Sequence, residues 1–533
     1  MDSGDQTMAP AVSPEAVVAT PLPDVSDILF VLLICLIIFS LPNYVLGDGS
    51  TGWHLVTGKY ILDHGQIPQQ DLFSYTFPTR AWVPYEWFSD LLGALLVKIG
   101  GIKLLAVASA TCIAALFALM YRQCRRYGAH FIVAATLTVL GILISSVHWL
   151  ARPHLLGFLF LFIFCTHLEQ FRRGAESSRR MILWLAITMV LWSNAHPGFL
   201  VGLAATFIYL FSEAMIAFVS QGETRENSML KARAFATALG IVFACTLINP
   251  NAAHLYSYIA SYLHSSVVLA ATDEYLPPNF HDLHAILMAV LFAIFVFALA
   301  ITRRKAAAAQ ILMILAFAWL ALNSRRNEPL FVIASVPLIA DLLSEVDFSR
   351  LTGAQIFTPS HWLGVLKEKW NLYGGIVDEV EGTCTMHILP IALTALLVLS
   401  CFFGGRLGPI ELVSSRFDND TKPSQTLDYL RSHNMDFNRG FNLDNWGGYI
   451  AYMTGKRVFI DDRLDFYGEP FFMQYGEIVQ AKPGWQALLD KENIEWILFP
   501  KDSTLEHALQ KDSGWSLLAS DSAAVLYGRN PVK

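Results

Sequence analysis

Polar and ionisable side chains gather at alternate ends of the apolar segments of this 533-residue chain, so that in a membrane they would lie on the same side. Such side chains can move protons, bind phosphate or hold a metal ion, and they are costly to place near a membrane. Together with Trp53, they are Asp48, His54, Asp71, Arg80, Glu86, Arg152, His154, Asn194, His196, Asp273, Glu274, His281, His284, Arg325, Arg326 and Glu328. A functional site is therefore expected on this side.

Each of these residues also has a purely structural interpretation. Asp48 can cap a helix end, the histidines can be satisfied residues at the membrane interface, and Arg325 with Arg326 can anchor to lipid headgroups. His54, His154 and His196 could together hold a metal ion, although no two have the close spacing of a zinc motif. Their clustering favours a site more than any single residue does.

Composition indicates the elements that must position these residues. The chain is 54% hydrophobic and 15% charged with a mean hydropathy of +0.45, whereas a soluble protein has roughly a quarter of its residues charged. The net charge of -7 includes no basic block, which argues against a nucleic-acid partner. Apolar segments that can cross or nearly cross a bilayer lie at residues 28–46, 101–120, 131–149, 155–168, 181–195, 199–219, 234–249, 285–301, 306–322, 329–343 and 387–404. The chain is thus predicted to be a polytopic α-helical membrane protein with about eleven transmembrane helices.

Basic residues predict its orientation. Lys and Arg concentrate in alternate connecting segments, at residues 122–126, 172–180, 225–233, 303–305 and 350–369, and short basic loops stay in the cytoplasm. We therefore expect a disordered cytoplasmic tail at residues 1–27, a transmembrane domain at 28–405 with a long outer loop at 47–100, and an extracytoplasmic C-terminus. Residues 84–99 carry charges within an apolar stripe, which favours a helix lying in the membrane interface over a twelfth span.

The composition changes to that of a soluble domain at residues 411–533. Strand-like segments lie at 440–443, 457–460, 495–499, 516–519 and 523–527, and helical patterns at 424–433, 468–481, 484–492 and 503–511. Alternation of the two types predicts a small α/β domain.

This layout resembles the GT-C class of membrane glycosyltransferases, in particular the branch similar to protein mannosyltransferases and lipid A aminoarabinose transferases. The resemblance rests on Asp48 just past the first span, on Asp71 in the long outer loop and on the outer C-terminal domain. The segments GDGSTGWHLVTGKYILDHGQIPQQDLFSYT, YEWFSDLL and FNLDNWGGYIAYMTGKRVFIDDRLDFYG also resemble those of a widespread, poorly characterised bacterial family.

The resemblance implies inverting sugar transfer from a polyprenyl-phosphate carrier to a glycan, lipid or protein acceptor at the outer face of a bacterial inner membrane. Asp48 would be the general base, with a pKa raised at the bilayer edge, and Asp71 or His54 would orient the acceptor. The donor phosphate would meet Arg325, Arg326, Arg152, His154 and His196. The acceptor would meet Trp53, Glu86, Trp446, Asp461, Asp462, Arg463 and Tyr467, although a core Trp446 and a loop ion pair are the simpler interpretation. A divalent ion, Mg or Mn, is the expected cofactor if one is needed.

Two rival functions share this pattern. A transporter would also place polar groups inside a helix bundle, but the sequence contains no second copy of any motif, as inverted repeats would require. A non-catalytic envelope assembly protein would keep the fold and bind lipid-linked glycans without turnover.

Overall fold

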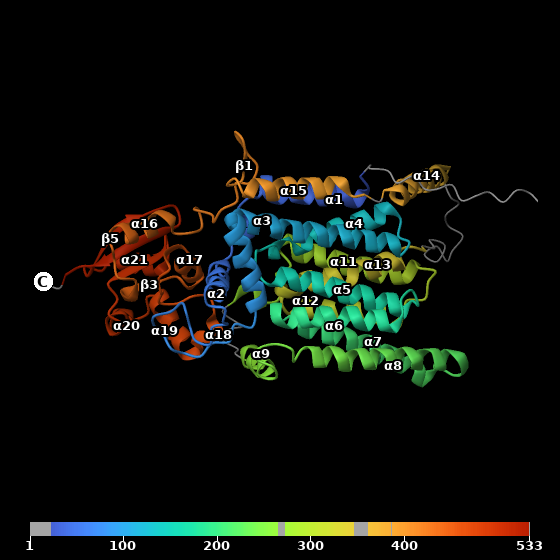
Figure 1. The fold of residues 1–533 in the computed structure, drawn as a ribbon, viewed down its shortest axis with the longest axis horizontal. Coiled ribbons are helices and arrows are strands. Elements are labelled where there is room, and N and C mark those ends of the chain that lie inside the picture. The colour runs from blue at the N-terminus through green and yellow to red at the C-terminus, as the bar shows by residue number, and fades with distance from the viewer. Residues whose placement is uncertain (1–22, 265–271, 346–360, 385, 532–533) are drawn as a thin grey trace, which may run out of the picture.

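The computed structural model describes residues 23–264, 272–345, 361–384 and 386–531. Long helices lie side by side in a bundle, and a smaller domain formed by the C-terminal residues covers one end of it (Figure 1). The predicted fold class, an α-helical membrane protein with a C-terminal α/β domain, is confirmed.

Each of the predicted apolar segments coincides with a helix. The helices are α1 (Val25–Cys35, continued by a π turn at Leu36–Ser40), α3 (Trp87–Arg126), α4 (Phe131–Ser145), α5 (His154–Arg172), α6 (Ser178–Ala195), α7 (Phe199–Val219), α8 (Gly222–Cys245), α11 (Leu283–Ile301), α12 (Ala308–Asn323), α13 (Glu328–Leu342) and α15 (Ile388–Cys401). Among the described residues, six helices are long and apolar enough to cross a membrane, and three further apolar helices are shorter. The count of eleven spans stays a prediction.

Two glycines divide α3 into two parts. Gly100 and Gly101 have non-helical backbone angles, and Gly101 has a φ of 70°, a conformation that glycine adopts without steric cost. The part before the glycines corresponds to the predicted interfacial segment at residues 84–99, and the part after them to the predicted span at 101–120. The sequence therefore predicted this boundary correctly.

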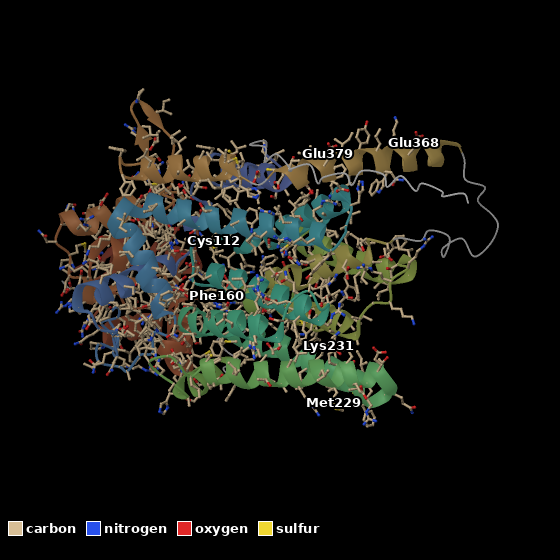
Figure 2. All side chains as sticks on the ribbon, turned by 45° about the vertical axis from the view of Figure 1, so that its right-hand side comes forward. Cys112, Phe160, Met229, Lys231, Glu368 and Glu379 are labelled. Carbon is tan, nitrogen blue, oxygen red and sulfur yellow. The ribbon has the colours of Figure 1, made fainter. Side chains whose placement is uncertain are left out.

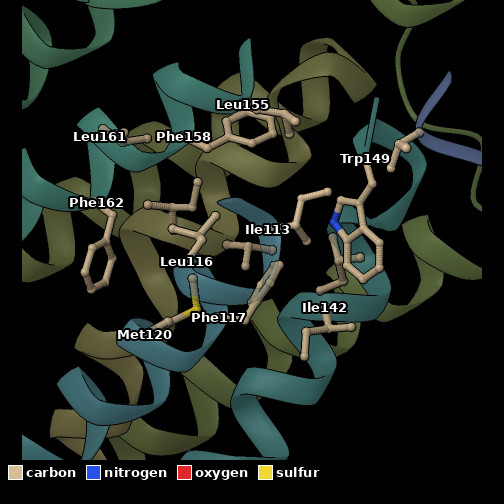
Figure 3. Close-up of a cluster of buried hydrophobic side chains, with 14 of the residues drawn as sticks. Ile113, Leu116, Phe117, Met120, Ile142, Trp149, Leu155, Phe158, Leu161 and Phe162 are labelled. Atoms are coloured by element: carbon tan, nitrogen blue, oxygen red, sulfur yellow. The ribbon is translucent and has the colours of Figure 1, made fainter. Parts of the chain in front are cut away.

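Apolar side chains from several helices form the core of the bundle. Figure 3 shows Ile113, Leu116 and Phe117 of α3 beside Phe158 of α5 and the ring of Trp149. The rings of Phe117 and Trp149 have centroids 6.0 Å apart. Trp149 begins the turn that leads into α5, so the same packing that holds the bundle together also fixes the position of this turn.

Buried ion pairs lie toward the end of the bundle away from the C-terminal domain. Arg172 and Arg173 contact the fully buried Glu169 at 2.6 and 2.9 Å. Lys231 of α8, labelled in Figure 2, donates a hydrogen bond to the Arg172 carbonyl at 2.8 Å. These basic residues belong to the predicted cytoplasmic segments, and the assignment of this end to the cytoplasm stays a prediction.

The C-terminal domain contains a four-stranded mixed sheet of order β3-β4-β6-β5. Its strands are β3 (Gly440–Asn442), β4 (Trp496–Pro500), β5 (Trp515–Ser520) and β6 (Ala524–Arg529), and only the β3–β4 pair is parallel. The predicted helices correspond to α16 (Ser424–Ser432), α19 (Glu469–Val479), α20 (Trp485–Lys491) and α21 (Thr504–Leu509).

The strand predicted at residues 457–460 is wrong. Val458 instead forms one bridge to Ser74, because its N–H donates to the Phe73 carbonyl at 2.8 Å and its carbonyl accepts from Tyr75 at 3.0 Å. The partner of this segment is thus the outer loop and not the sheet.

Two helices that the sequence did not predict dock the C-terminal domain on the outer loop. They are α2 (Thr51–His64) and α17 (Asp444–Thr454), and they meet at glycines. A methyl group on Gly52 would overlap the Gly448 carbonyl, and one on Gly448 would lie 2.7 Å from the Gly49 carbonyl. Only glycine allows the two backbones to approach this closely.

Candidate functional site

An arginine joins two carboxylates where the bundle meets the outer loop. Asp48 follows the short helix Tyr44–Leu46, Arg152 lies in the turn before α5, and Glu274 lies in the short helix Asp273–Tyr275. Arg152 donates from Nε and Nη2 to both carboxylate oxygens of Asp48, and from Nη1 to Glu274 Oε1 at 2.9 Å. The Ser50 backbone N–H also donates to Asp48 at 2.8 Å. Segments far apart in sequence therefore share one partly buried guanidinium.

This pairing reverses the electrostatic expectation for Asp48. Burial disfavours the charged carboxylate, but the neighbouring Arg152 guanidinium outweighs burial and holds the pKa of Asp48 well below its ordinary value. Burial would raise the pKa of Glu274, but the charges of Arg152 and Arg326 outweigh burial and lower this pKa to about 2. The predicted raised pKa of Asp48 is wrong, because its countercharge comes from a distant turn.

The raised carboxyl pKa that was expected of Asp48 is found instead at Glu86. Burial raises the pKa of Glu86 to about 8. Its two carboxylate oxygens lie 3.8 Å from His54 Nε2 and 3.7 Å from His196 Nε2. His54 Nδ1 lies 2.6 Å from Asp90 Oδ1, which fixes the orientation of the imidazole. Among the described residues, His196 Nε2 and Asp90 Oδ2 are buried without a hydrogen-bond partner, so the cluster can accept a further polar ligand.

A cavity of about 620 Å³ opens beside these groups. Its lining includes charged and polar residues, among them Arg152, His154, His196, Tyr258, Glu274 and Arg326. It also includes apolar residues, among them Phe158, Trp192, Leu200, Val201, Ile259, Trp319 and Leu330. A second cavity of about 170 Å³ shares Arg152 and is also lined by His54 and Asp90. This combination suits a ligand with an anionic head and an apolar tail.

The two adjacent arginines have different surroundings. Arg326 lines the large cavity, donates to the hydroxyl of Tyr275 and lies 5.2 Å from the centre of its ring. Arg325 is not among the residues that line the cavity, and its Nη2 lies 3.5 Å from His284 Nε2. The structure therefore places Arg326 with Arg152, His154 and His196, and separates Arg325 from them.

Asp71 belongs to a buried network that joins the outer loop to the C-terminal domain. Arg463 donates to Asp71 at 2.6 Å and to Asp461 at 2.7 Å, and the Tyr467 hydroxyl donates to Asp461 at 2.9 Å. The guanidinium of Arg463 also lies 4.4 Å from the centre of the Phe73 ring. A buried ion-pair network of this kind favours the structural interpretation of these residues, and their assignment to catalysis or acceptor binding stays a prediction.

The predicted tryptophans are also hydrogen-bonded within the protein. Trp446 is 4% exposed and donates to the Thr421 carbonyl at 3.1 Å, as a core residue would. Trp53 donates to Asp462 at 2.8 Å, and burial raises the pKa of Asp462 well above its ordinary value. Sequence reasoning missed Lys422, a buried cation whose charge acts on Asp48, because it lies in an ordinary polar loop of the C-terminal domain.

The three histidines considered as metal ligands, which lack the close spacing of a zinc motif, do not form a metal site as a set. His154 Nε2 instead hydrogen-bonds to the His148 carbonyl at 2.7 Å, and the ring centres of His154 and His196 are 6.5 Å apart. Among the described residues, the group that gathers ligand atoms within 4.8 Å of one another is Asp24, Asp27, Cys384 and His387. Asp24 there also caps α1 through the Asp27 N–H at 2.8 Å. A cysteine and a histidine in this set differ from the all-oxygen ligands that Mg and Mn prefer.

No protein-family model and no curated protein matches the chain. Among solved structures it is similar to the oligosaccharyltransferase of Archaeoglobus fulgidus, with a TM-score of 0.53 in both forms. The apo form is 11% identical, and the alignment covers 89% of this chain and 69% of the oligosaccharyltransferase chain. The form tethered to an acceptor peptide containing the NVT sequon is 12% identical, with coverages of 95% and 74%. The chain has a GT-C fold.

A third GT-C protein, ArnT from Cupriavidus metallidurans bound to undecaprenyl phosphate, aligns with a TM-score of 0.48 at 13% identity, covering 94% of this chain and 97% of its own. The predicted fold relationship is confirmed by the two oligosaccharyltransferase structures. At 11–12% identity this likeness concerns the fold alone, so the reaction has to be argued from the residues of the site.

Proposed function

We propose that this protein transfers a sugar from a polyprenyl-phosphate carrier to an envelope acceptor at the extracytoplasmic face of a bacterial inner membrane. The observation that carries the proposal is the large cavity, which combines Arg152 and Arg326 at one part with an apolar wall. A prenyl chain needs the apolar wall, and a phosphate needs the fixed cations. The GT-C fold supports it, since the oligosaccharyltransferase with this fold is known with an acceptor peptide.

In the proposed reaction the acceptor hydroxyl oxygen attacks the anomeric carbon of the sugar, and the bond from that carbon to the phosphate oxygen breaks with inversion. Polyprenyl phosphate leaves with the electron pair, and Arg152 and Arg326 offset its negative charge. The hydroxyl proton needs a base with a pKa near the operating pH. Glu86 fits this role better than Asp48, because its pKa is raised to about 8 while that of Asp48 is lowered. We therefore propose Glu86 as the proton acceptor and Asp48 as the residue that holds Arg152.

The adjacent arginines provide a matched test. Arg326→Gln removes a cation from the cavity, whereas Arg325→Gln removes one that does not line it. A hydrogen bond to a charged group contributes about 1.5–3 kcal/mol, or roughly 10- to 100-fold in affinity. Binding of undecaprenyl phosphate to protein in nanodiscs should weaken by about that factor for Arg326→Gln and stay unchanged for Arg325→Gln. Equal affinities for the two variants would show that the cavity does not hold the phosphate.

The non-catalytic alternative predicts the same donor binding without turnover. Incubating the wild-type protein with a polyprenyl-phosphate sugar and an envelope glycan acceptor distinguishes the two. Release of free polyprenyl phosphate that depends on the acceptor supports transfer, and its absence with intact donor binding supports the assembly role.

A further inference from the structure

Two acids and one cation meet beside the large cavity. Asp48 and Glu274 approach each other closely enough that the charge of Asp48 acts on Glu274. Two converging carboxylates beside a cavity form a typical ligand pair for a divalent cation. Here the Arg152 guanidinium lies between them and takes both oxygens of Asp48 and one oxygen of Glu274. The fixed positive charge of the guanidinium at these oxygens therefore opposes the binding of a divalent ion between the two acids.

We propose that Arg152 takes the place of a divalent cation in this site, so that the site binds its phosphate ligand without metal. The inference rests on the proposed function for the identity of that ligand, but its metal-binding part does not depend on any transfer reaction.

The charges near Arg152 support this role. Arg152, Arg326 and Lys422 contribute three positive charges, against two negative charges from Asp48 and Glu274. One positive charge is left over for an anionic ligand. A guanidinium has five N–H donors, and the carboxylates use three of them, so Arg152 keeps two for a phosphate at the cavity that it lines. A divalent ion in place of Arg152 would also leave a positive surplus, larger by one charge, but its affinity would depend on free metal.

Mn²⁺ binding to EDTA-treated protein in nanodiscs, measured by electron paramagnetic resonance, tests the proposal. The wild type and Glu274→Gln should bind the same amount of Mn²⁺, because Glu274 holds Arg152 and not an ion. Any Mn²⁺ held by the separate Asp24, Asp27, Cys384 and His387 group contributes equally to both. Arg152→Asn frees the two carboxylates and should gain about one Mn²⁺, which the double variant Arg152→Asn with Glu274→Gln should lose again.

A wild-type Mn²⁺ site that Glu274→Gln abolishes overturns the proposal, even if Arg152→Asn fails to fold. A folded Arg152→Asn variant without the gained site also overturns it, because the two acids would then not form a cation site. Undecaprenyl phosphate binding by the wild type should be unchanged by EDTA. If no sugar transfer is ever detected, the proposed function fails, while the Mn²⁺ comparison still decides the role of Arg152.

Discussion

Replacing Glu86 by Gln should change how both stability and activity depend on pH. The ordinary pKa of a glutamate is 4.5, and burial raises that of Glu86 to about 8. The folded protein therefore retains a proton that the unfolded chain releases, so this contribution to stability is complete below about pH 4.5 and declines as the pH rises to about 8. The slope is at most about 1.4 kcal/mol per pH unit, or about 3 kcal/mol between pH 6 and 8. Glu86→Gln keeps the shape of the side chain and removes this loss.

The neighbouring histidines and arginines do not produce the same signature, and the buried Asp90, Asp462 and Asp465, whose pKa values are also raised, titrate in both the wild type and the variant. Burial lowers the pKa values of His54 and His196 well below 6.5, so both imidazoles stay neutral across this pH window. Arg152 and Arg326, the cations that act on Glu86, stay charged throughout. The difference in pH dependence between the wild type and the variant therefore reports Glu86 itself.

Thermal unfolding of purified protein between pH 6 and 9 provides the measurement. The melting temperature of the wild type should fall relative to Glu86→Gln by several degrees, roughly 2 °C for each kcal/mol in a chain of this size. Glu477→Gln, an exposed position on α19, should behave as the wild type does. The transfer rate of the wild type should rise through about pH 8 and level off above it. Glu86→Gln should lose about 100- to 10,000-fold. Parallel melting curves for wild type and Glu86→Gln would refute the raised pKa, and retained transfer would refute Glu86 as the base.

Three further outcomes are expected. Asp48→Asn weakens the hydrogen bonds that position Arg152 and should lower donor affinity about tenfold, the order of one charged hydrogen bond. The pH dependence of the transfer rate should stay as in the wild type. A large loss of kcat at unchanged donor affinity would instead make Asp48 the base. Gly52→Ala overlaps the Gly448 carbonyl and should lower the melting temperature through about 1–3 kcal/mol of strain, whereas Gly476→Ala, with open space around it on α19, should leave the melting temperature unchanged or raise it slightly. A reporter fused after Lys533 should be active outside the cytoplasm, and activity inside would contradict the predicted orientation.

Local pattern was sufficient to predict most elements of the fold. Apolar runs of the right length produced the bundle helices, and alternating patterns produced the strands β3 to β6. The failures share one cause, which is that the partner of the segment lies far away in sequence. Residues 457–460 have strand composition, but their backbone hydrogen bonds go to the outer loop. The glycines of α2 and α17 lower the helix propensity of these segments. Their role, which is to let the two helix backbones approach closely, becomes visible only where the helices meet.

The site was predicted in part for the same reason. Asp48, Arg152 and Arg326 could be proposed from their types and from their positions beside apolar segments. Their pairing could not, because the Arg152 side chain that lowers the pKa of Asp48 lies 104 positions away. Adjacency in sequence was equally misleading for Arg325 and Arg326, since successive residues of a short helix point in different directions. Lys422 has no sequence signal, because only the docking of the C-terminal domain brings its charge to Asp48.

The ion pair between Asp71 and Arg463 spans 392 positions, and this separation has a consequence for synthesis. The outer loop is made long before the residues that complete its fold. A growing or truncated chain already contains Asp48, Glu86 and Arg152, but it lacks the Arg463 partner of Asp71 and the α17 partner of α2. In such a chain the Asp71 carboxylate lacks its ion pair with Arg463, and the face of α2 that carries Gly52 is exposed. Maturation of the site therefore waits for the last quarter of the chain, and incomplete products carry a recognisable defect for proteolytic quality control.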